Sequence, residues 1–226
     1  MKTIGIIGGM GPQATVDLYQ KIIQRTPASC DQEHLHVIID SYPQIPDRTA
    51  YLLSGQGQDP LPYLQESAER LQTAGAHALI MPCNTAHAFV PALREHIQIP
   101  ILHIAEAALA HIGSAHGKRI GVLATTGTQK AGIYRHVLQS AGYTVIEPNA
   151  AQSEALMRCI YDGAKAGKTA EYAPLMADTV AGMDADSFIL ACTEIPLFLP
   201  WWQDPRPRID ATDALAAAAV AFARHP

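Results

Sequence analysis

The sequence has few charged residues and no segment in which positive charge accumulates. Charged side chains make up 16% of the 226 residues, and 21 acidic against 16 basic side chains give a formal net charge of −5. The lysines and arginines are scattered, and no aromatic residues accompany them in a pattern suited to stacking on bases. Because binding to a phosphate backbone needs a basic surface, the composition argues against nucleic acid as a partner.

Long apolar runs are also absent. No segment approaches the roughly 20 apolar residues of a membrane-spanning helix, so we expect no membrane partner. The apolar start at residues 1–7 is too short and too interrupted by glycine for a signal peptide, and Asp17 and Lys21 follow it without a cleavage-type site. We therefore expect a cytoplasmic protein.

The four cysteines form no CxxC pair, which favours reduced thiols over disulfides. Cys83 and His87 have the i, i+4 spacing of a metal-binding pair at the start of a helix. A metal site needs further ligands, and no second Cys/His pair with such spacing appears, so we predict no metal.

Apolar runs instead alternate with longer amphipathic stretches along almost the whole chain. We expect strands at residues 3–7, 36–40, 77–81, 101–103, 119–124, 144–146 and 186–191. We expect helices at residues 13–26, 61–74, 85–96, 105–115, 130–141, 153–166, 172–182 and 211–224. This alternation predicts an α/β protein with mainly parallel sheets of the doubly wound type.

A coarse internal repeat divides this pattern into two lobes. Residues 4–9 and 120–127 are each a glycine-containing apolar strand that runs into a loop of small residues and then a helix. We predict an N-terminal lobe at residues 1–99, to which a helix in residues 209–226 returns, and a C-terminal lobe at residues 100–208. We expect the proline-rich segment 196–207 to be irregular. Chance resemblance between two βα units remains the alternative explanation of the repeat.

Two cysteines stand directly after apolar strands. Cys83 follows one predicted strand and Cys192 follows another, more than a hundred residues later. Ligands of open α/β sheets bind outside the carboxyl ends of the strands, so the two thiols are predicted to face each other across one cleft. Helix starts after them would lower their pKa values. The alternative is that each cysteine is only a small buried apolar residue.

The loop of residues 8–12 lies between a strand and a helix and contains three glycines. Glycine lets the backbone approach a ligand closely, and the free N–H groups of a helix start attract an anion. The glycine order differs from the dinucleotide-binding G-x-G-x-x-G pattern. We therefore favour a carboxylate or another small anion over a nucleotide.

Several motifs together resemble the aspartate/glutamate racemase family over essentially the whole chain. They are Gly8-Gly9-Met10-Gly11-Pro12, Pro46-Asp47-Arg48-Thr49, Pro82-Cys83-Asn84-Thr85, Ala124-Thr125-Thr126-Gly127 and Cys192-Thr193-Glu194-Ile195-Pro196. Glutamate racemases of the cell-wall type have Asp-Ser in the first loop and a histidine after the second Cys-Thr. Met10 and Glu194 stand at these places here, which favours the aspartate racemase branch.

The resemblance implies cofactor-independent racemisation of L- and D-aspartate by Cys83 and Cys192 on opposite faces of Cα. It associates Cys83 with the D-enantiomer and Cys192 with the L-enantiomer, and it implies a homodimer. Without a cofactor to accept electrons, the developing enediolate needs donors around the α-carboxylate. The candidate substrate-binding residues are Gly9, Met10, Gly11, Arg48, Asn84, Thr85, Thr126, Lys165, Thr193 and Glu194.

Two basic residues favour a dicarboxylic substrate. We expect Arg48 in a loop after residues 43–46, where the family's Pro-Asp-Arg-Thr motif places it, and Lys165 matches the family position of a second basic residue. The alternative is that each is an ordinary surface residue. Glutamate or broader acidic amino acid racemisation is an alternative, as is a non-catalytic protein that binds small anions. Among enzymes that share this fold, hydantoin racemases, maleate isomerases and arylmalonate decarboxylases are the closest competitors. The cysteine pair disfavours the decarboxylases, which use a single cysteine.

Overall fold

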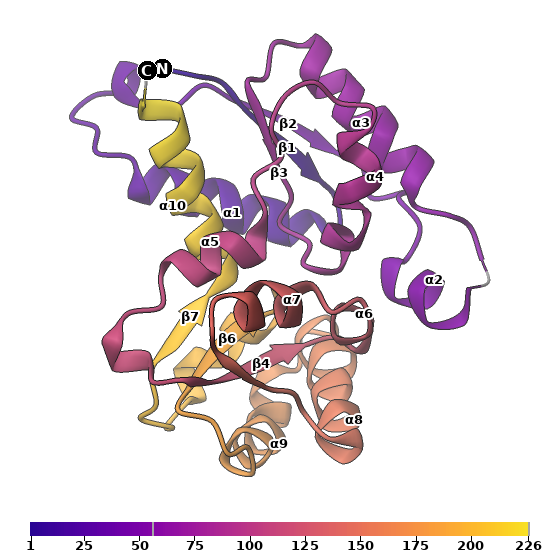
Figure 1. The fold of residues 1–226 in the computed structure, drawn as a ribbon, viewed down its shortest axis with the longest axis vertical. Coiled ribbons are helices and arrows are strands. Elements are labelled where there is room, and N and C mark those ends of the chain that lie inside the picture. The colour runs from indigo at the N-terminus through magenta and orange to yellow at the C-terminus, as the bar shows by residue number, and fades with distance from the viewer. Residues whose placement is uncertain (56, 226) are drawn as a thin grey trace.

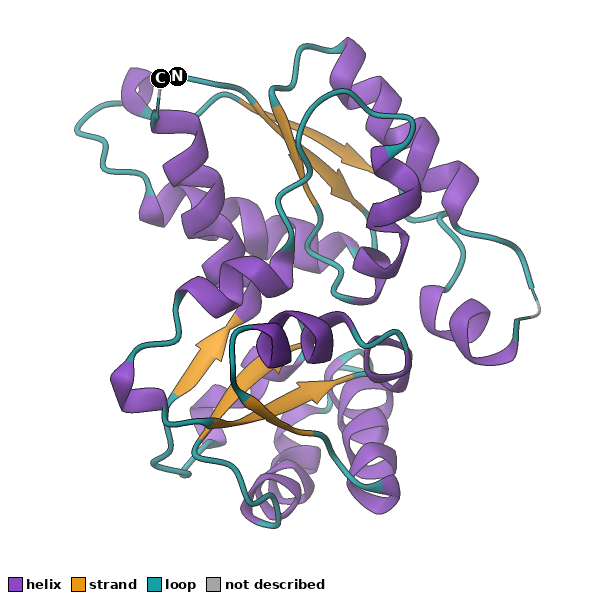
Figure 2. Ribbon diagram, viewed as in Figure 1, coloured by secondary structure: helices purple, strands orange, loops and turns teal. Residues whose placement is uncertain are grey.

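Two parallel sheets, one in each half of the chain, form the frame of the protein. The computed structural model describes residues 1–55 and 57–225. Within these residues, the first sheet has three strands in the order β2-β1-β3, and the second has four in the order β5-β4-β6-β7. All strand pairs are parallel, and helices surround both sheets (Figure 1, Figure 2). The predicted α/β fold with two doubly wound lobes is confirmed.

The strands are β1 Ile4–Gly8, β2 Val37–Ser41, β3 Ala78–Ile80, β4 Arg119–Ala124, β5 Thr144–Ile146, β6 Ser187–Ala191 and β7 Arg208–Asp210. The α-helices are α1 Pro12–Arg25, α2 Arg48–Ser54, α3 Leu61–Thr73, α4 Val90–Arg94, α5 Ile104–Ala110, α6 Thr126–Lys130, α7 Ile133–Ser140, α8 Ala150–Arg158, α9 Thr169–Ala181 and α10 Ala211–Arg224. Short 3₁₀ segments cover Asp31–Glu33, Thr85–Phe89, Ser114–His116 and Ile195–Trp201, and a π-helical segment covers Cys159–Ala164.

One apolar core lies between the two sheets. Successive strand residues point to opposite faces, so one face of each sheet contributes to this shared core. It includes Ile6 of β1, Val122 of β4 and Leu215 of α10. The outer faces have separate cores, one with Ile7 under α3 and one with Leu190 under α9. The lobes are therefore joined through buried side chains.

The last helix, α10, runs from the second sheet back along the first lobe. It packs against α1 and α5, and Figure 1 shows it in yellow beside both. The Lys2 N–H donates to the Ala223 carbonyl at 2.9 Å. This contact brings the N-terminal and C-terminal ends of the described chain together.

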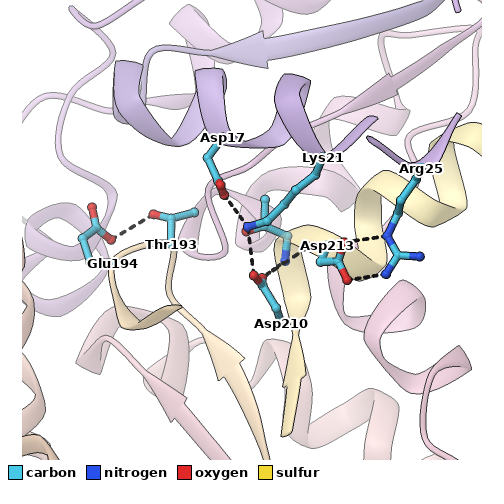
Figure 3. Close-up of polar contacts among 8 residues, drawn as sticks. Asp17, Lys21, Arg25, Thr193, Glu194, Asp210 and Asp213 are labelled. Atoms are coloured by element: carbon cyan, nitrogen blue, oxygen red, sulfur yellow. Dashed lines mark hydrogen bonds and ion pairs between the residues drawn. The ribbon is translucent and has the colours of Figure 1, made fainter. Parts of the chain in front are cut away.

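Ion pairs fix α1 to the start of α10 (Figure 3). Lys21 Nζ lies 2.5 Å from Asp17 Oδ2 within α1 and 2.8 Å from Asp210 Oδ2 at the end of β7. Arg25 donates to both carboxylate oxygens of Asp213 in the first turn of α10. Asp210 also accepts backbone N–H groups of that turn. The position of α1, and of the loop before it, is thus tied to the second sheet.

The internal repeat has a physical basis in two glycines. Gly5 in β1 pairs with Leu79 in β3, and Gly121 in β4 pairs with Phe188 in β6. A Cβ at Gly5 would lie 2.8 Å from the Leu79 side chain, and one at Gly121 would lie 2.5 Å from the Phe188 ring. In each lobe, the partner strand fills the space above a glycine of the central strand. The two glycines therefore occupy equivalent places.

Some predicted elements differ from those observed. The strand predicted at residues 101–103 reduces to one parallel bridge between Leu79 and Ile101. Before this segment, Pro100 has no N–H to donate to a neighbouring strand. At its end, His103 already caps α5, since its ring accepts the Ala105 N–H at 3.3 Å. The helix predicted at residues 85–96 is a 3₁₀ segment followed by the short α4.

Other observed elements, among them α2, the 3₁₀ helix Ile195–Trp201 and β7, were not predicted. Arg48 was expected in a loop but is the first residue of α2, because Asp47 caps this helix by accepting the Ala50 N–H at 2.7 Å. The proline-rich segment contains the 3₁₀ helix Ile195–Trp201, in whose first turn Pro196 needs no N–H partner. It is followed by the short strand β7. The prediction that residues 196–207 are irregular is wrong for the first part of that segment.

Candidate active site

Both candidate cysteines line one pocket between the two lobes. The carboxyl ends of β1 and β3 face it from the first lobe, and those of β4 and β6 from the second. The pocket is lined by Met10, Asp47, Arg48, Thr49, Cys83, Asn84, Thr85, Thr125, Tyr161, Lys165, Ala191, Cys192, Thr193 and Glu194. Nine of the twelve predicted site residues are among these.

The cysteines occupy equivalent positions of the repeat. Cys83 lies four residues after Leu79, the partner of Gly5, and Cys192 lies four residues after Phe188, the partner of Gly121. Both side chains are nearly buried, with 8% of Cys83 and 7% of Cys192 exposed. The pseudo-symmetry thus places one nearly buried thiol in each lobe at the same pocket.

Glu194 binds the thiol of Cys192. Cys192 Sγ donates to Glu194 Oε2 at 2.9 Å. Thr193 Oγ1 donates to the same oxygen at 2.9 Å, as Figure 3 shows. Burial, and then the charge and hydrogen bond of Glu194, raise the pKa of Cys192 well above its usual range. The expectation that a following helix start lowers this pKa is wrong, because these opposing effects are larger. Cys192 is held as a protonated thiol.

Replacing Glu194 with glutamine is expected to make Cys192 more reactive. The Glu194→Gln substitution removes the charge that raises the pKa of Cys192, and removing one nearby charge shifts a pKa by about one unit or more. At pH 8, below the pKa, the thiolate fraction and the alkylation rate then rise about tenfold per unit. The rate of iodoacetamide labelling at Cys192, followed by peptide mass spectrometry, measures this change.

A matched control for this measurement is Asp47→Asn. Asp47 lines the same pocket, but its carboxylate caps α2, and asparagine caps a helix about as well. This variant is expected to label at Cys192 at the rate of the unmodified protein. Equal labelling of Cys192 in Glu194→Gln and in the unmodified protein would contradict the role of Glu194.

Polar residues that follow Cys83 join the two lobes. The Asn84 side chain is 4% exposed, its Oδ1 accepts a hydrogen bond from Tyr134 of α7, and its Nδ2 has no partner among the described residues. Thr85 Oγ1 lies 3.1 Å from Thr125 Oγ1 and 2.8 Å from Thr128 Oγ1. Asn84 therefore keeps a free donor at the pocket, whereas the Thr85 hydroxyl already has partners in the second lobe.

Two cations line the pocket from different lobes. Arg48 Nη1 donates to the carbonyls of Ile45 at 3.0 Å and Pro46 at 2.8 Å, which fixes the guanidinium. Arg48 Nε is buried without a partner among the described residues. Lys165 Nζ lies 4.0 Å from Glu194 Oε1 and over the ring of Tyr161. A bound dianion would thus meet a positive group on each side.

The remaining predicted residues lie around the pocket rather than in it. The Gly9 N–H donates to Thr15 Oγ1 at 2.9 Å, so it is already used within the protein. Gly9 has φ +88°, and a Cβ there would lie 2.4 Å from the backbone of Tyr42, which explains the glycine. Gly11 lines an adjoining cavity that shares Lys165, Thr193 and Glu194 with this pocket. The Thr126 hydroxyl contacts the Met157 sulfur at 3.7 Å.

The comparison with protein families identifies the chain. The family described as Asp/Glu/Hydantoin racemase matches residues 7–219. The protein belongs to this family.

Its relatives include racemases of several amino acids. It is 28% identical to the broad specificity amino-acid racemase RacX of Bacillus subtilis, over 96% of both chains. It is 29% identical to a glutamate racemase of Lactiplantibacillus plantarum, over 75% of this chain and 66% of that protein. The solved structure of Picrophilus torridus aspartate racemase superposes with a TM-score of 0.86 at 28% identity, covering 99% of this chain and 94% of that one.

In this member of the racemase family, sequence reasoning missed several residues of the pocket. Tyr161 lies four residues before Lys165, on the same face of one helical segment, and this spacing could have indicated it. Thr125, rather than its neighbour Thr126, reaches the pocket. Asp47 and Thr49 flank Arg48 in the quoted motif and also line the pocket.

His87 lies outside the pocket of this racemase family member. It is buried, its Nε2 lies 3.2 Å from the Met81 carbonyl, and its ring packs edge-on against His103. Burial lowers the pKa of His87 to about 3, so the ring is neutral. Among the residues that the structure describes, no group of three or more potential ligands suits a metal ion, and no helix is long and apolar enough to cross a membrane.

Proposed function

We propose that this protein racemises acidic amino acids, with aspartate as its substrate, and that Cys83 and Cys192 exchange the Cα proton without a cofactor. The observation that carries the proposal is the pair of buried thiols at equivalent positions of two lobes, lining one pocket together with Arg48 and Lys165. A family of Asp/Glu/Hydantoin racemases is consistent with this chemistry.

The protonation of Cys192 fits it to act as the acid when D-aspartate is bound. Cys192 carries a proton, because burial and Glu194 raise its pKa. With D-aspartate bound, the Cys83 thiolate removes the Cα proton and Cys192 S–H protonates the opposite face, giving L-aspartate. The cycle leaves Cys83 as thiol and Cys192 as thiolate, which is the form that removes the proton of L-aspartate in the reverse direction.

Stabilisation of the enediolate is the energetic problem of this reaction. The Cα–H of an amino acid is a weak acid, so negative charge on the α-carboxylate must be stabilised as the proton leaves. Asn84 Nδ2 is a buried donor at the pocket with no partner among the described residues. Its position directly after Cys83, and its own burial, support a role as donor to that carboxylate.

The preference for aspartate rests on charge and on the relatives. Two cations suit two carboxylates, and the protein is similar to an aspartate racemase over 99% of its length. Its similarity to RacX favours, as the second candidate, a broader racemase of which aspartate is one substrate. The proposal includes the homodimer that the family resemblance implies, which light scattering of the purified protein tests. It also includes the cytoplasmic location expected from the sequence.

Incubation with L-aspartate in deuterated water tests the proposed function. The expected result is D-aspartate by chiral chromatography and loss of the Cα–H signal by NMR, without added pyridoxal phosphate. L-Glutamate, L-asparagine and L-alanine are assayed in parallel, and comparable rates on all of them would favour the broader racemase. If neither racemisation nor deuterium exchange is observed with aspartate and with glutamate, a non-catalytic anion-binding protein becomes the better hypothesis.

A further inference from the structure

The second lobe holds the amide of Asn84 in one orientation. Tyr134 of α7 is 2% exposed, and its hydroxyl donates to Asn84 Oδ1 at 2.5 Å across the boundary between the lobes. Tyr134 is absent from the residues that line the pocket, whereas Asn84 is present. The hydrogen bond of Tyr134 therefore reaches the pocket through Asn84.

We propose that Tyr134 is a positioning residue, which fixes the Asn84 amide so that Nδ2 rather than Oδ1 is presented to the carboxylate of the substrate. The proposal rests on the proposed function, since it names how that pocket recognises a carboxylate. The inference extends the proposed function by assigning a positioning role to Tyr134, a residue of the second lobe that does not line the pocket.

Rotation of an amide by 180° exchanges an acceptor for two donors. In the observed orientation the phenol donates to Oδ1, and the free end is the NH₂ group. In the opposite orientation the phenol would accept from Nδ2, and its own hydrogen would have no acceptor among the described residues. A buried donor without a partner is costly, so Tyr134 disfavours that orientation.

The protonation of the phenol agrees with this direction of the hydrogen bond. Complete burial raises the pKa of Tyr134 well above its usual range, so the hydroxyl keeps its proton. A carbonyl oxygen facing the substrate would repel a carboxylate, whereas an NH₂ group binds it. The orientation of one amide therefore decides whether this side of the pocket attracts or repels the anion.

The surrounding contacts make the arrangement depend on both lobes. Thr85, next to Asn84, bonds to Thr125 and Thr128 of the second lobe. Tyr134 itself belongs to the core shared by the two sheets. Asn84 is thus held from the second lobe at its own side chain and at the following residue, and the donor geometry follows from the packing of the lobes.

A double-mutant cycle tests the proposal through kcat/KM for aspartate. Loss of one donor to a developing oxyanion costs about 10²–10³-fold, so Asn84→Ala is expected to lower kcat/KM by about 100-fold. Tyr134→Phe keeps the ring and frees the amide, and it is expected to lower kcat/KM by about tenfold. In the Asn84→Ala background, Tyr134→Phe should then have no further effect. Effects that multiply in the double variant would overturn the proposal.

Two further variants separate positioning from packing. Tyr143→Phe alters another tyrosine of the second lobe that packs against the same core, and it is expected to leave kcat/KM unchanged. Asn84→Asp can still accept from Tyr134 but places an oxygen where Nδ2 stands, so its kcat/KM should fall below that of Asn84→Ala. Activity of Asn84→Asp equal to that of the unmodified protein would overturn the assigned orientation.

An NMR measurement reports on the same contact without activity. The sequence contains two asparagines, Asn84 and Asn149, so ¹⁵N-asparagine labelling gives two side-chain amide pairs. Asn149 is the internal control, because its Oδ1 caps α8 by accepting the Gln152 N–H. Tyr134→Phe is expected to shift the Asn84 pair and leave the Asn149 pair in place, and an unmoved Asn84 pair would overturn the proposal. If the protein lacks racemase activity, this measurement still tests the contact between Tyr134 and Asn84. Failure of the proposed function can therefore be distinguished from failure of this inference.

Discussion

Replacing either Cys83 or Cys192 with serine is expected to lower racemisation of aspartate by about a thousandfold. General acid–base groups contribute about 10²–10⁴-fold, and a serine hydroxyl is a far weaker acid than a thiol. Both thiols line the pocket, and each faces it from a different lobe. Loss of one thiol therefore removes either the base or the acid of every turnover. Chiral chromatography of reactions started from each enantiomer measures the loss.

The two variants are expected to differ in proton exchange. In Cys192→Ser, the Cys83 thiolate still removes the Cα proton of D-aspartate and can return a deuteron to the same face. Deuterium then appears in D-aspartate without inversion, and L-aspartate exchanges far more slowly. Cys83→Ser should show the opposite preference. The same preference for one enantiomer in both variants would contradict the assignment of the faces.

Two other cysteines provide the controls for these variants. Cys30 is exposed and lies outside the pocket, so Cys30→Ser is expected to keep normal turnover. Cys159 is buried, and burial raises its pKa to about 11. Cys159→Ser tests whether loss of a buried thiol elsewhere affects activity through stability alone. Near-normal turnover in both Cys83→Ser and Cys192→Ser would rule out the two-thiol mechanism.

The sequence predicts the sheets and the thiols because both depend on local patterns. A short apolar run followed by a small polar residue marks a parallel strand and its carboxyl end, and Cys83 and Cys192 stand at two such ends. The paired glycines Gly5 and Gly121 are also visible in the sequence. Their equivalence became clear only from the residues that pack against them, Leu79 and Phe188.

The sequence prediction failed at one local contact and at two contacts between distant segments. The helix-start argument for Cys192 omitted the charge of Glu194, whose carboxylate accepts from the thiol only two residues earlier. The strand β7 is short and follows prolines, and it forms because its backbone pairs with the neighbouring strand β6. Thr85 was predicted to bind substrate, but its hydroxyl meets Thr125, some forty residues later in the chain.

The separation of the two cations between lobes suggests how selectivity arises. Arg48 begins α2 in the first lobe, and Lys165 follows the π-helical segment in the second. Neither lobe alone carries both charges of the pocket. Under the proposed function, recognition of a dicarboxylic amino acid therefore depends on both lobes, as does the proposed orientation of Asn84 by Tyr134.

Replacing Arg48 with methionine is expected to reduce the preference for aspartate over asparagine by about 100-fold in kcat/KM. We expect the guanidinium to bind the side-chain carboxylate, because Nη1 is fixed by two carbonyls and Nε is buried without a partner among the described residues. Charged hydrogen bonds are worth about 1.5–3 kcal/mol, and the loss also leaves a carboxylate unpaired in a pocket that contains Glu194. The side-chain amide of asparagine carries no charge, so kcat/KM for asparagine should fall much less.

Two further variants, a control and a conservative substitution, test whether the preference for aspartate depends on the guanidinium of Arg48. Lys168→Met removes an exposed cation three residues after Lys165, and it should leave kcat/KM unchanged for both aspartate and asparagine. Arg48→Lys keeps the charge but loses the bidentate geometry of the guanidinium, so it should retain part of the preference. If Arg48→Met lowered kcat/KM for aspartate and asparagine equally, Arg48 would bind the α-carboxylate that both share. The side-chain carboxylate would then have to be recognised by Lys165 on the opposite lobe.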